Sequence, residues 1–137
     1  MKKNYKKFKL HPIKGDKSFY TVYIFDDRAT MRLFSAQIFT NGSNHKFEAV
    51  THSYTAQDSD TIGSILFYKG GFGIGVASHE LAHAVNYFFM RKKLKFNMGG
   101  NVDEKWKHYD ELYAWSLGYV NNQFWKKCGV KPSKERY

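Results

Sequence analysis

The sequence predicts an α+β domain in which an N-terminal antiparallel β-meander is followed by two main helices. Residues 19–68 are rich in β-branched and aromatic side chains with partial alternation, a pattern typical of strands. Residues 75–137 instead contain two long helical runs, each followed by glycine-containing turn residues. Strands followed by helices within one chain indicate the α+β class.

The strand-rich half divides into segments separated by polar turns. Asp26 and Asp27 form one turn, and the residues of 41–44 form the next. Connections this short favour antiparallel neighbours. The predicted strands, in chain order, are Phe19–Phe25, Met31–Phe39, Phe47–Tyr54 and Ile62–Tyr68.

The helical half begins at about Val76. The first helix is predicted to run to Lys95, where the turn-forming residues 97–101 end it. The second runs from about Asp103 to Lys127, and Gly129 follows it. A chain of 137 residues suits one domain. We therefore expect a single domain over residues 19–137, preceded by a basic N-terminal segment, residues 1–18.

The net charge is +10, and seven lysines lie within the first 17 residues. Such a charge can attract nucleic acid or an acidic protein partner. The lysines are spread along the chain, however, and no nucleic-acid-binding module is recognisable. The favoured interpretation is a solvated surface with a loose basic tail, so nucleic acid is not the preferred partner.

The chain has a single cysteine, Cys128, so it cannot form an internal disulfide. That usage fits a reducing compartment. No apolar run has the length of a signal peptide core or a membrane span. We expect a cytoplasmic protein that makes no membrane contact.

The segment His79-Glu80-Leu81-Ala82-His83 is the most specific chemical signal in the sequence. Histidines four residues apart lie on one face of a helix and can share one metal ion, with Zn²⁺ the expected cofactor. Glu80, about 100° round the helix, can act as general base on a metal-activated water. Fewer than about one random chain in fifty of this composition would contain the pattern. The alternative is two unrelated histidines at helical spacing.

A catalytic zinc site needs a third protein ligand. Glu111 is the preferred candidate, because Ala114 and Gly118 follow it at helical spacing and would let the two helices approach closely. His108 is its main rival. The other candidates are Asp103, Glu104 and Asp110.

An oxyanion that develops during hydrolysis needs a donor besides the metal. His108, Tyr113, Tyr109 and His52 are the candidates, with a preference for His108 if it is not a ligand. Asn86 follows His83 by three residues and is placed either to orient a ligand or to lie on the helix surface.

Three segments together resemble small phage and prophage zincin-like proteins of the minimal gluzincin type. Residues 79–86 match a His-Glu-x-x-His-Ala-x-Asn helix, and residues 109–118 match a later Asp-Glu-x-x-Ala-aromatic-x-x-Gly helix. Residues 61–67 resemble the strand before the first helix. The resemblance covers about residues 61–120. It implies a zincin-like fold with the motif on the first of the two main helices, His79, His83 and Glu111 as zinc ligands, and Glu80 as catalytic base.

The resemblance also implies hydrolysis of a peptide bond in a peptide or protein substrate. In such enzymes the substrate adds as an extra strand to an exposed sheet edge, here expected to be Ile62–Tyr68. An ordinary paired strand is the alternative for this segment. A second hypothesis is a catalytically silent zincin-fold protein that inhibits a host factor by binding it, with the basic charge favouring an acidic or nucleic-acid-associated target.

Overall fold

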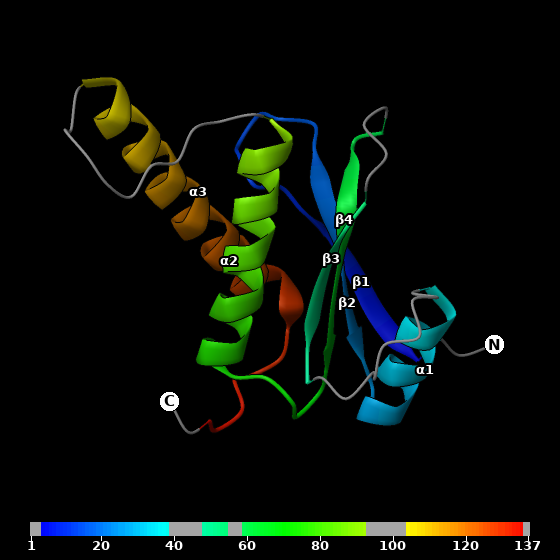
Figure 1. The fold of residues 1–137 in the computed structure, drawn as a ribbon. Coiled ribbons are helices and arrows are strands. Elements are labelled where there is room, and N and C mark those ends of the chain that lie inside the picture. Colours follow the sequence, from blue (N-terminus) through cyan, green and yellow to red (C-terminus); the bar gives the residue numbers. More distant parts are fainter. Residues whose placement is uncertain (1–3, 39–47, 55–58, 93–103, 136–137) are drawn as a thin grey trace.

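The computed structural model describes residues 4–38, 48–54, 59–92 and 104–135, with the backbone alone for residues 104–110. Within these residues it has seven elements of secondary structure (Figure 1). They are β1 (Tyr5–Leu10), β2 (Phe19–Phe25), α1 (Arg28–Ile38), β3 (Val50–Ser53), β4 (Thr61–Tyr68), α2 (Ile74–Arg91) and α3 (Glu104–Cys128).

The four described strands form one mixed sheet in the order β1-β2-β4-β3. The outer pairs, β1 with β2 and β3 with β4, are antiparallel, and the central pair, β2 with β4, is parallel. The predicted α+β class is confirmed, but the predicted antiparallel meander is wrong. A parallel pair needs a crossover connection, and the chain between β2 and β4 supplies it through α1 and β3.

Helix α1 occupies most of the segment that we predicted as the strand Met31–Phe39. Asp27 caps this helix, because its side chain accepts a hydrogen bond from the Thr30 backbone N–H at 2.7 Å. Met31 and Ser35, four residues apart, are both fully buried, as one face of a helix requires. The strand prediction is therefore wrong over residues 31–38, and Phe39 lies outside the described residues.

The other three strand predictions fare better. The strand Phe19–Phe25 is confirmed, and Ile62–Tyr68 is confirmed as β4, which begins one residue earlier. Phe47–Tyr54 is confirmed only as the shorter β3, and Phe47 lies outside the described residues. The two predicted helices are confirmed as α2 and α3, with ends that differ by a few residues from those predicted. The predicted end of the first helix, Lys95, lies outside the described residues.

Strand β4 does not lie at an edge of the sheet. It pairs with β2 on one side and with β3 on the other, so the predicted exposed edge at Ile62–Tyr68 is wrong. Among the described strands, β3 is the edge strand at this end of the sheet. Gly63 permits a close approach between the two strands, because a Cβ atom there would overlap the carbonyl oxygen of His52.

The described residues 4–18 are not a loose basic tail, because they contribute β1. Its lysine-rich residues pair with β2 along the whole strand, and Leu10 is fully buried. Phe8 lies against Phe124 of α3, with 6.1 Å between ring centroids. The lysines of β1 lie on an edge strand, where charged side chains oppose pairing with another chain.

The helices cover both faces of the sheet. Helices α2 and α3 lie on one face and α1 on the other (Figure 1). Two groups of buried apolar side chains result: a large one between the sheet and the α2–α3 pair, and a smaller one beneath α1. None of the helices within the described residues is long and apolar enough to cross a membrane.

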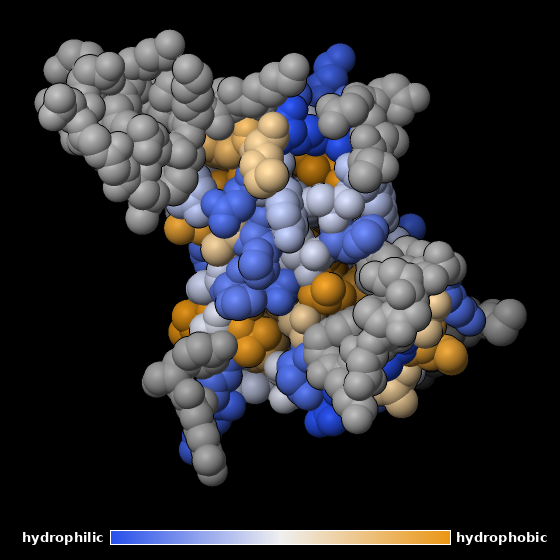
Figure 2. Space-filling view, viewed as in Figure 1, coloured by the Kyte–Doolittle hydropathy of each residue, from blue (hydrophilic) through white to orange (hydrophobic). Residues whose placement is uncertain are grey.

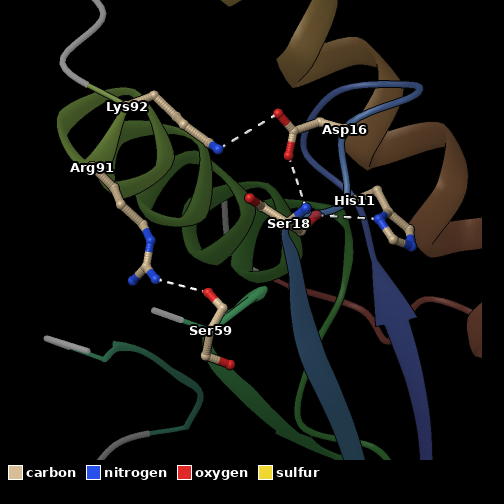
Figure 3. Close-up of polar contacts among 6 residues, drawn as sticks. All are labelled: His11, Asp16, Ser18, Ser59, Arg91 and Lys92. Atoms are coloured by element: carbon tan, nitrogen blue, oxygen red, sulfur yellow. Dashed lines mark hydrogen bonds and ion pairs between the residues drawn. The ribbon is translucent and has the colours of Figure 1, made fainter. Parts of the chain in front are cut away.

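Helix α2 is attached to the rest of the fold at both ends. At its start, the Glu135 carboxylate accepts hydrogen bonds from the backbone N–H groups of Gly73 and Val76. At its end, Arg91 donates to the carbonyl oxygen of Ser59 at 3.0 Å (Figure 3). These contacts fix the helix that carries the histidine motif.

The neighbouring Lys92 forms an ion pair with Asp16, with Nζ 3.7 Å from Oδ2 (Figure 3). Burial acts to raise the pKa of Asp16, but hydrogen bonds from Ser18 and the charge of Lys92 outweigh it and lower the pKa below its ordinary value. Asp16 therefore stays charged and holds the end of α2 near the turn before β2.

Candidate metal centre

His79 and His83 converge on one face of α2. Their Nε2 atoms lie 3.2 Å apart, and their ring centroids are separated by 4.7 Å. His79 is exposed and His83 is half-buried. The ring of His83 stacks on Tyr87, one turn further along, with an interplanar angle of 14°. Figure 2 shows a hydrophilic band along the face of α2, between apolar patches.

The separation of the two nitrogens fits a shared zinc ion. Zinc binds imidazole nitrogen at about 2.0–2.1 Å in tetrahedral geometry, so two such ligands lie about 3.3–3.4 Å apart. The observed 3.2 Å is close to this value. A hydrogen bond between two neutral imidazoles would give a similar distance. The two histidines can therefore supply two nitrogen ligands to a zinc ion, and the distance between them fits the pair with or without the ion.

The side chain of Glu80 extends from α2 to the edge strand β3. Its side chain is buried, with 6% exposed. The hydroxyl oxygen of Thr51, on β3, lies 2.6 Å from Glu80 Oε2 and 2.9 Å from the main-chain oxygen of Glu80. A separation of 2.6 Å is typical of a hydroxyl donating to a carboxylate. The motif glutamate is therefore held against β3 by a residue from the sheet.

A second contact joins β3 to α2. The buried Tyr20 hydroxyl donates to the carbonyl oxygen of Ala84 at 3.0 Å and lies 3.1 Å from the Ser53 hydroxyl. Burial raises the pKa of Tyr20 well above its ordinary value, so it stays a neutral hydroxyl. Ala84 follows Glu80 by one turn, and Ser53 follows Thr51 on the same face of β3. The two contacts hold β3 alongside α2 over one helical turn.

Tyr113 lies on the side of α3 that faces α2. Its hydroxyl donates to Asn86 Oδ1 at 2.8 Å, and its ring lies 5.3 Å from that of Phe89. Burial raises the pKa of Tyr113. Asn86 is predicted either to orient a ligand or to lie on the helix surface. In the structure it is exposed on α2 and accepts the hydrogen bond from Tyr113.

Glu111 lies on a different side of α3. It is two residues before Tyr113, which corresponds to about 200° round a helix. Glu111 is exposed and lines a surface pocket together with Ala114 and Gly118. A Cβ atom at Gly118 would meet nothing within 4 Å. The packing argument for Glu111 is therefore wrong, because these small residues border open space and do not bring α3 close to α2.

A three-ligand centre is not assembled in the described part of the chain. Among the side chains that the structure describes, no three His, Cys, Asp or Glu residues lie close enough to hold a metal ion together. The side chains of Glu104, His108, Tyr109 and Asp110 are not described, and Asp103 also lies outside the described residues. The structure therefore brings together two predicted ligands, His79 and His83, on the helix that also carries the predicted base, and does not bring Glu111 to them.

His52 lies on the opposite face of the sheet from the histidine pair. It is adjacent to Thr51 on β3, so their side chains point to opposite faces. Thr51 contacts α2, whereas the His52 ring lies 5.7 Å from Tyr54. Burial lowers the pKa of His52. This placement removes His52 from the candidate oxyanion donors.

Sequence reasoning did not find Thr51. No spacing signal connects Thr51 with Glu80, which is 29 residues away. The contact depends on the order of strands in the sheet and on the register between β3 and β4.

Comparisons with protein-family models, curated protein sequences and solved structures found no match to this chain.

Proposed function

We propose that this chain is a zinc-dependent metallopeptidase of the zincin type. His79 and His83 are two of its zinc ligands, and Glu80 is the general base. The observation that carries the proposal is the 3.2 Å separation of the two Nε2 atoms on the helix that also carries the buried Glu80 carboxylate, which is held by Thr51. Two imidazoles and an adjacent glutamate on one helix are the elements that metal-assisted hydrolysis requires.

A zinc ion bound there would polarise the substrate carbonyl and lower the pKa of water. The third ligand is proposed to come from the start of α3, with Glu111 preferred and His108 as its rival. A carboxylate added to two histidines is an established ligand set for catalytic zinc. Because Glu111 lies on the exposed side of α3, its participation requires the first turns of this helix to reorient when the ion binds.

Glu80 would act on the water and then on the leaving group. Its carboxylate takes a proton from the attacking water and donates it to the departing amine nitrogen. Burial beside β3 shields the carboxylate from bulk water, and the Thr51 contact occupies one of its two oxygens. Tyr113 is the described candidate for a donor to the developing oxyanion, and its present partner is Asn86.

The substrate peptide is proposed to dock along β3. This strand pairs with β4 on one side, and no described strand pairs with its other side. A peptide that adds there as a strand would run beside α2, because Thr51 and Ser53 tie β3 to that helix. The edge expected at Ile62–Tyr68 is thus reassigned to β3.

The experiment uses Glu80→Gln. Purified wild-type protein and the variant are compared for zinc content, thermal unfolding and cleavage of a mixed library of fluorescence-quenched peptides. The variant is expected to keep its zinc and its fold but to lose at least about 100-fold in turnover, because general acid–base catalysis contributes that much. Glu48→Gln, which removes a carboxylate paired with Arg28 and Arg32 near α1, is the matched control. Equal cleavage by Glu80→Gln and wild type would reject the proposed base.

A second candidate function is stoichiometric binding of an acidic or nucleic-acid-associated partner. The observation that favours it is a lysine cluster on β1 and the end of α3. Lys6 donates to the carbonyl oxygen of Cys128, and Lys127 donates to that of Lys9, so the two segments lie together. No ion pair with a described carboxylate neutralises these lysines. A biological effect that survives Glu80→Gln would support this binding function over catalysis.

A further inference from the structure

We propose that Thr51 is a positioning residue for the general base. Its hydroxyl holds the Glu80 carboxylate in one orientation, so that the strand on which the peptide docks also orients the group that activates water. This inference rests on the proposed peptidase function. It adds a residue outside the His-Glu-x-x-His motif to the chemical machinery.

The Thr51 hydroxyl has one hydrogen and two acceptors within reach. They are Glu80 Oε2 at 2.6 Å and the main-chain oxygen of Glu80 at 2.9 Å. The main-chain oxygen lies within α2, where the N–H four residues later is its regular partner. The carboxylate oxygen is nearer and charged, so it is the stronger acceptor. Thr51 therefore donates to the carboxylate.

This hydrogen bond decides which oxygen of Glu80 is left for chemistry. Among the described residues, Thr51 is the sole hydrogen-bond partner of the Glu80 side chain. With Oε2 engaged, Oε1 remains to accept a proton from water. A glutamate side chain has three rotatable bonds, so without the contact the carboxylate would sample other orientations and spend less time in the productive one.

The position of Thr51 depends on the sheet. Thr51 is opposite Ile65 in the β3–β4 register, and the neighbouring pair is His52 with Ser64. The β3–β4 pairing holds the two strands together, and Gly63 leaves room for the carbonyl oxygen of His52, which a Cβ atom there would overlap. Displacement of β3 would therefore move the Thr51 hydroxyl away from Glu80.

Ser53 offers a matched control. It lies two residues after Thr51 on the same face of β3 and also connects the strand to α2, but through Tyr20 and the Ala84 carbonyl oxygen. Loss of the Ser53 hydroxyl weakens the attachment of β3 without removing a contact from Glu80. A general loosening of the strand can thus be separated from the loss of a specific hydrogen bond to the base.

The kinetic experiment compares Thr51→Val, Thr51→Ser and Ser53→Ala on one quenched peptide that the wild type cleaves. We expect Thr51→Val to lower kcat about 10- to 100-fold with KM nearly unchanged, because small errors in the placement of a catalytic group are costly. Thr51→Ser, which keeps the hydroxyl, should retain most of the activity. Ser53→Ala, which weakens the attachment of the docking strand without removing a contact from Glu80, should raise KM and not lower kcat. A wild-type kcat in Thr51→Val, or an equal loss in Ser53→Ala, would overturn the inference.

A second readout does not depend on activity. Zinc content should be the same in wild type and Thr51→Val, because Thr51 contacts neither histidine in the structure. The melting temperature should fall more when Thr51→Val is made in the wild type than in a Glu80→Ala background, where the acceptor is absent. Equal shifts in the two backgrounds would show that Thr51 does not hold Glu80. A wild type that binds zinc but cleaves no peptide would instead reject the proposed function itself.

Discussion

The Nε2 atoms of His79 and His83 lie 3.2 Å apart across one turn of α2. Two interpretations fit this distance: one hydrogen bond between neutral imidazoles, or two ligands of one zinc ion. The position of Glu80 between the two histidines in sequence favours the second interpretation, because a glutamate at this position of the motif has a role in metal-assisted hydrolysis and none in a simple imidazole contact.

The third ligand can be identified from zinc-dependent stability. Because Glu111 is exposed, Glu111→Ala should hardly change the melting temperature of metal-free protein. If Glu111 completes the site, the variant should lose most of the increase in melting temperature that added zinc gives the wild type. The measurement is thermal unfolding with and without equimolar zinc.

His108→Ala and Asp110→Ala serve as comparisons for that experiment. Sequence spacing places position 110 three residues before Tyr113, on the stripe of α3 that contains this α2-facing residue. We expect the largest loss of zinc stabilisation in Glu111→Ala. A full zinc response in Glu111→Ala, with a loss in either of the other two variants, would transfer the ligand role to that residue.

The Glu135 carboxylate should stabilise the helix that carries the motif. Gly73, at the start of α2, makes no side-chain capping bond, and Glu135 satisfies the exposed N–H groups instead. Removal of a helix cap costs about 1 kcal/mol, and an anion at a helix N-terminus also interacts favourably with the helix dipole. Glu135→Ala should therefore lower the free energy of unfolding by about 1 kcal/mol in urea denaturation, whereas Lys134→Ala should change it little. Similar values for both variants would contradict the capping role.

His52 should make the stability depend on pH. Burial lowers the pKa of His52 in the folded protein below its ordinary value of about 6.5. As the pH falls, the unfolded chain therefore binds a proton at this position before the folded protein does. The free energy of unfolding should decrease as the pH falls through about 6.5 toward the lowered folded pKa, and then level off below both values.

His52→Gln removes this contribution. Urea unfolding of the metal-free wild type and variant between about pH 7.5 and 5 should show a shallower decline for the variant. Work on metal-free protein keeps zinc release from contributing to the slope. Parallel pH profiles for the two proteins would contradict the assignment.

Local patterns in the sequence predicted the strands Phe19–Phe25 and Ile62–Tyr68 and both long helices, because those segments have uniform character. The same patterns predict a strand at Met31 and Phe34, where the structure has the helix α1. The capping residue Asp27 and the helical spacing of buried side chains were present as signals, but the β-branched and aromatic surroundings outweighed them. β1 is not predicted by the local pattern, because its lysines conceal the alternation of Phe8 and Leu10.

The order of strands could not be predicted from local patterns. The almost continuous burial of β4 is typical of a central strand, and this feature of Ile62–Tyr68 was the available signal against an edge. The histidine pair and Glu80 followed from helical spacing alone. The Thr51 partner and the outward position of Glu111 depend on how separate elements pack, which residue spacing does not encode.

The most direct test of the central claim is the zinc content of purified protein and its dependence on the two histidines. Protein purified without chelator and dialysed against trace zinc should contain about one zinc per chain by elemental analysis. His79→Ala and His83→Ala should each remove it, while His11→Ala, which changes a histidine that contacts Ser18 far from the motif in sequence, should retain it. A wild type that remains free of zinc under these conditions, or single variants that keep a full equivalent, would contradict the account.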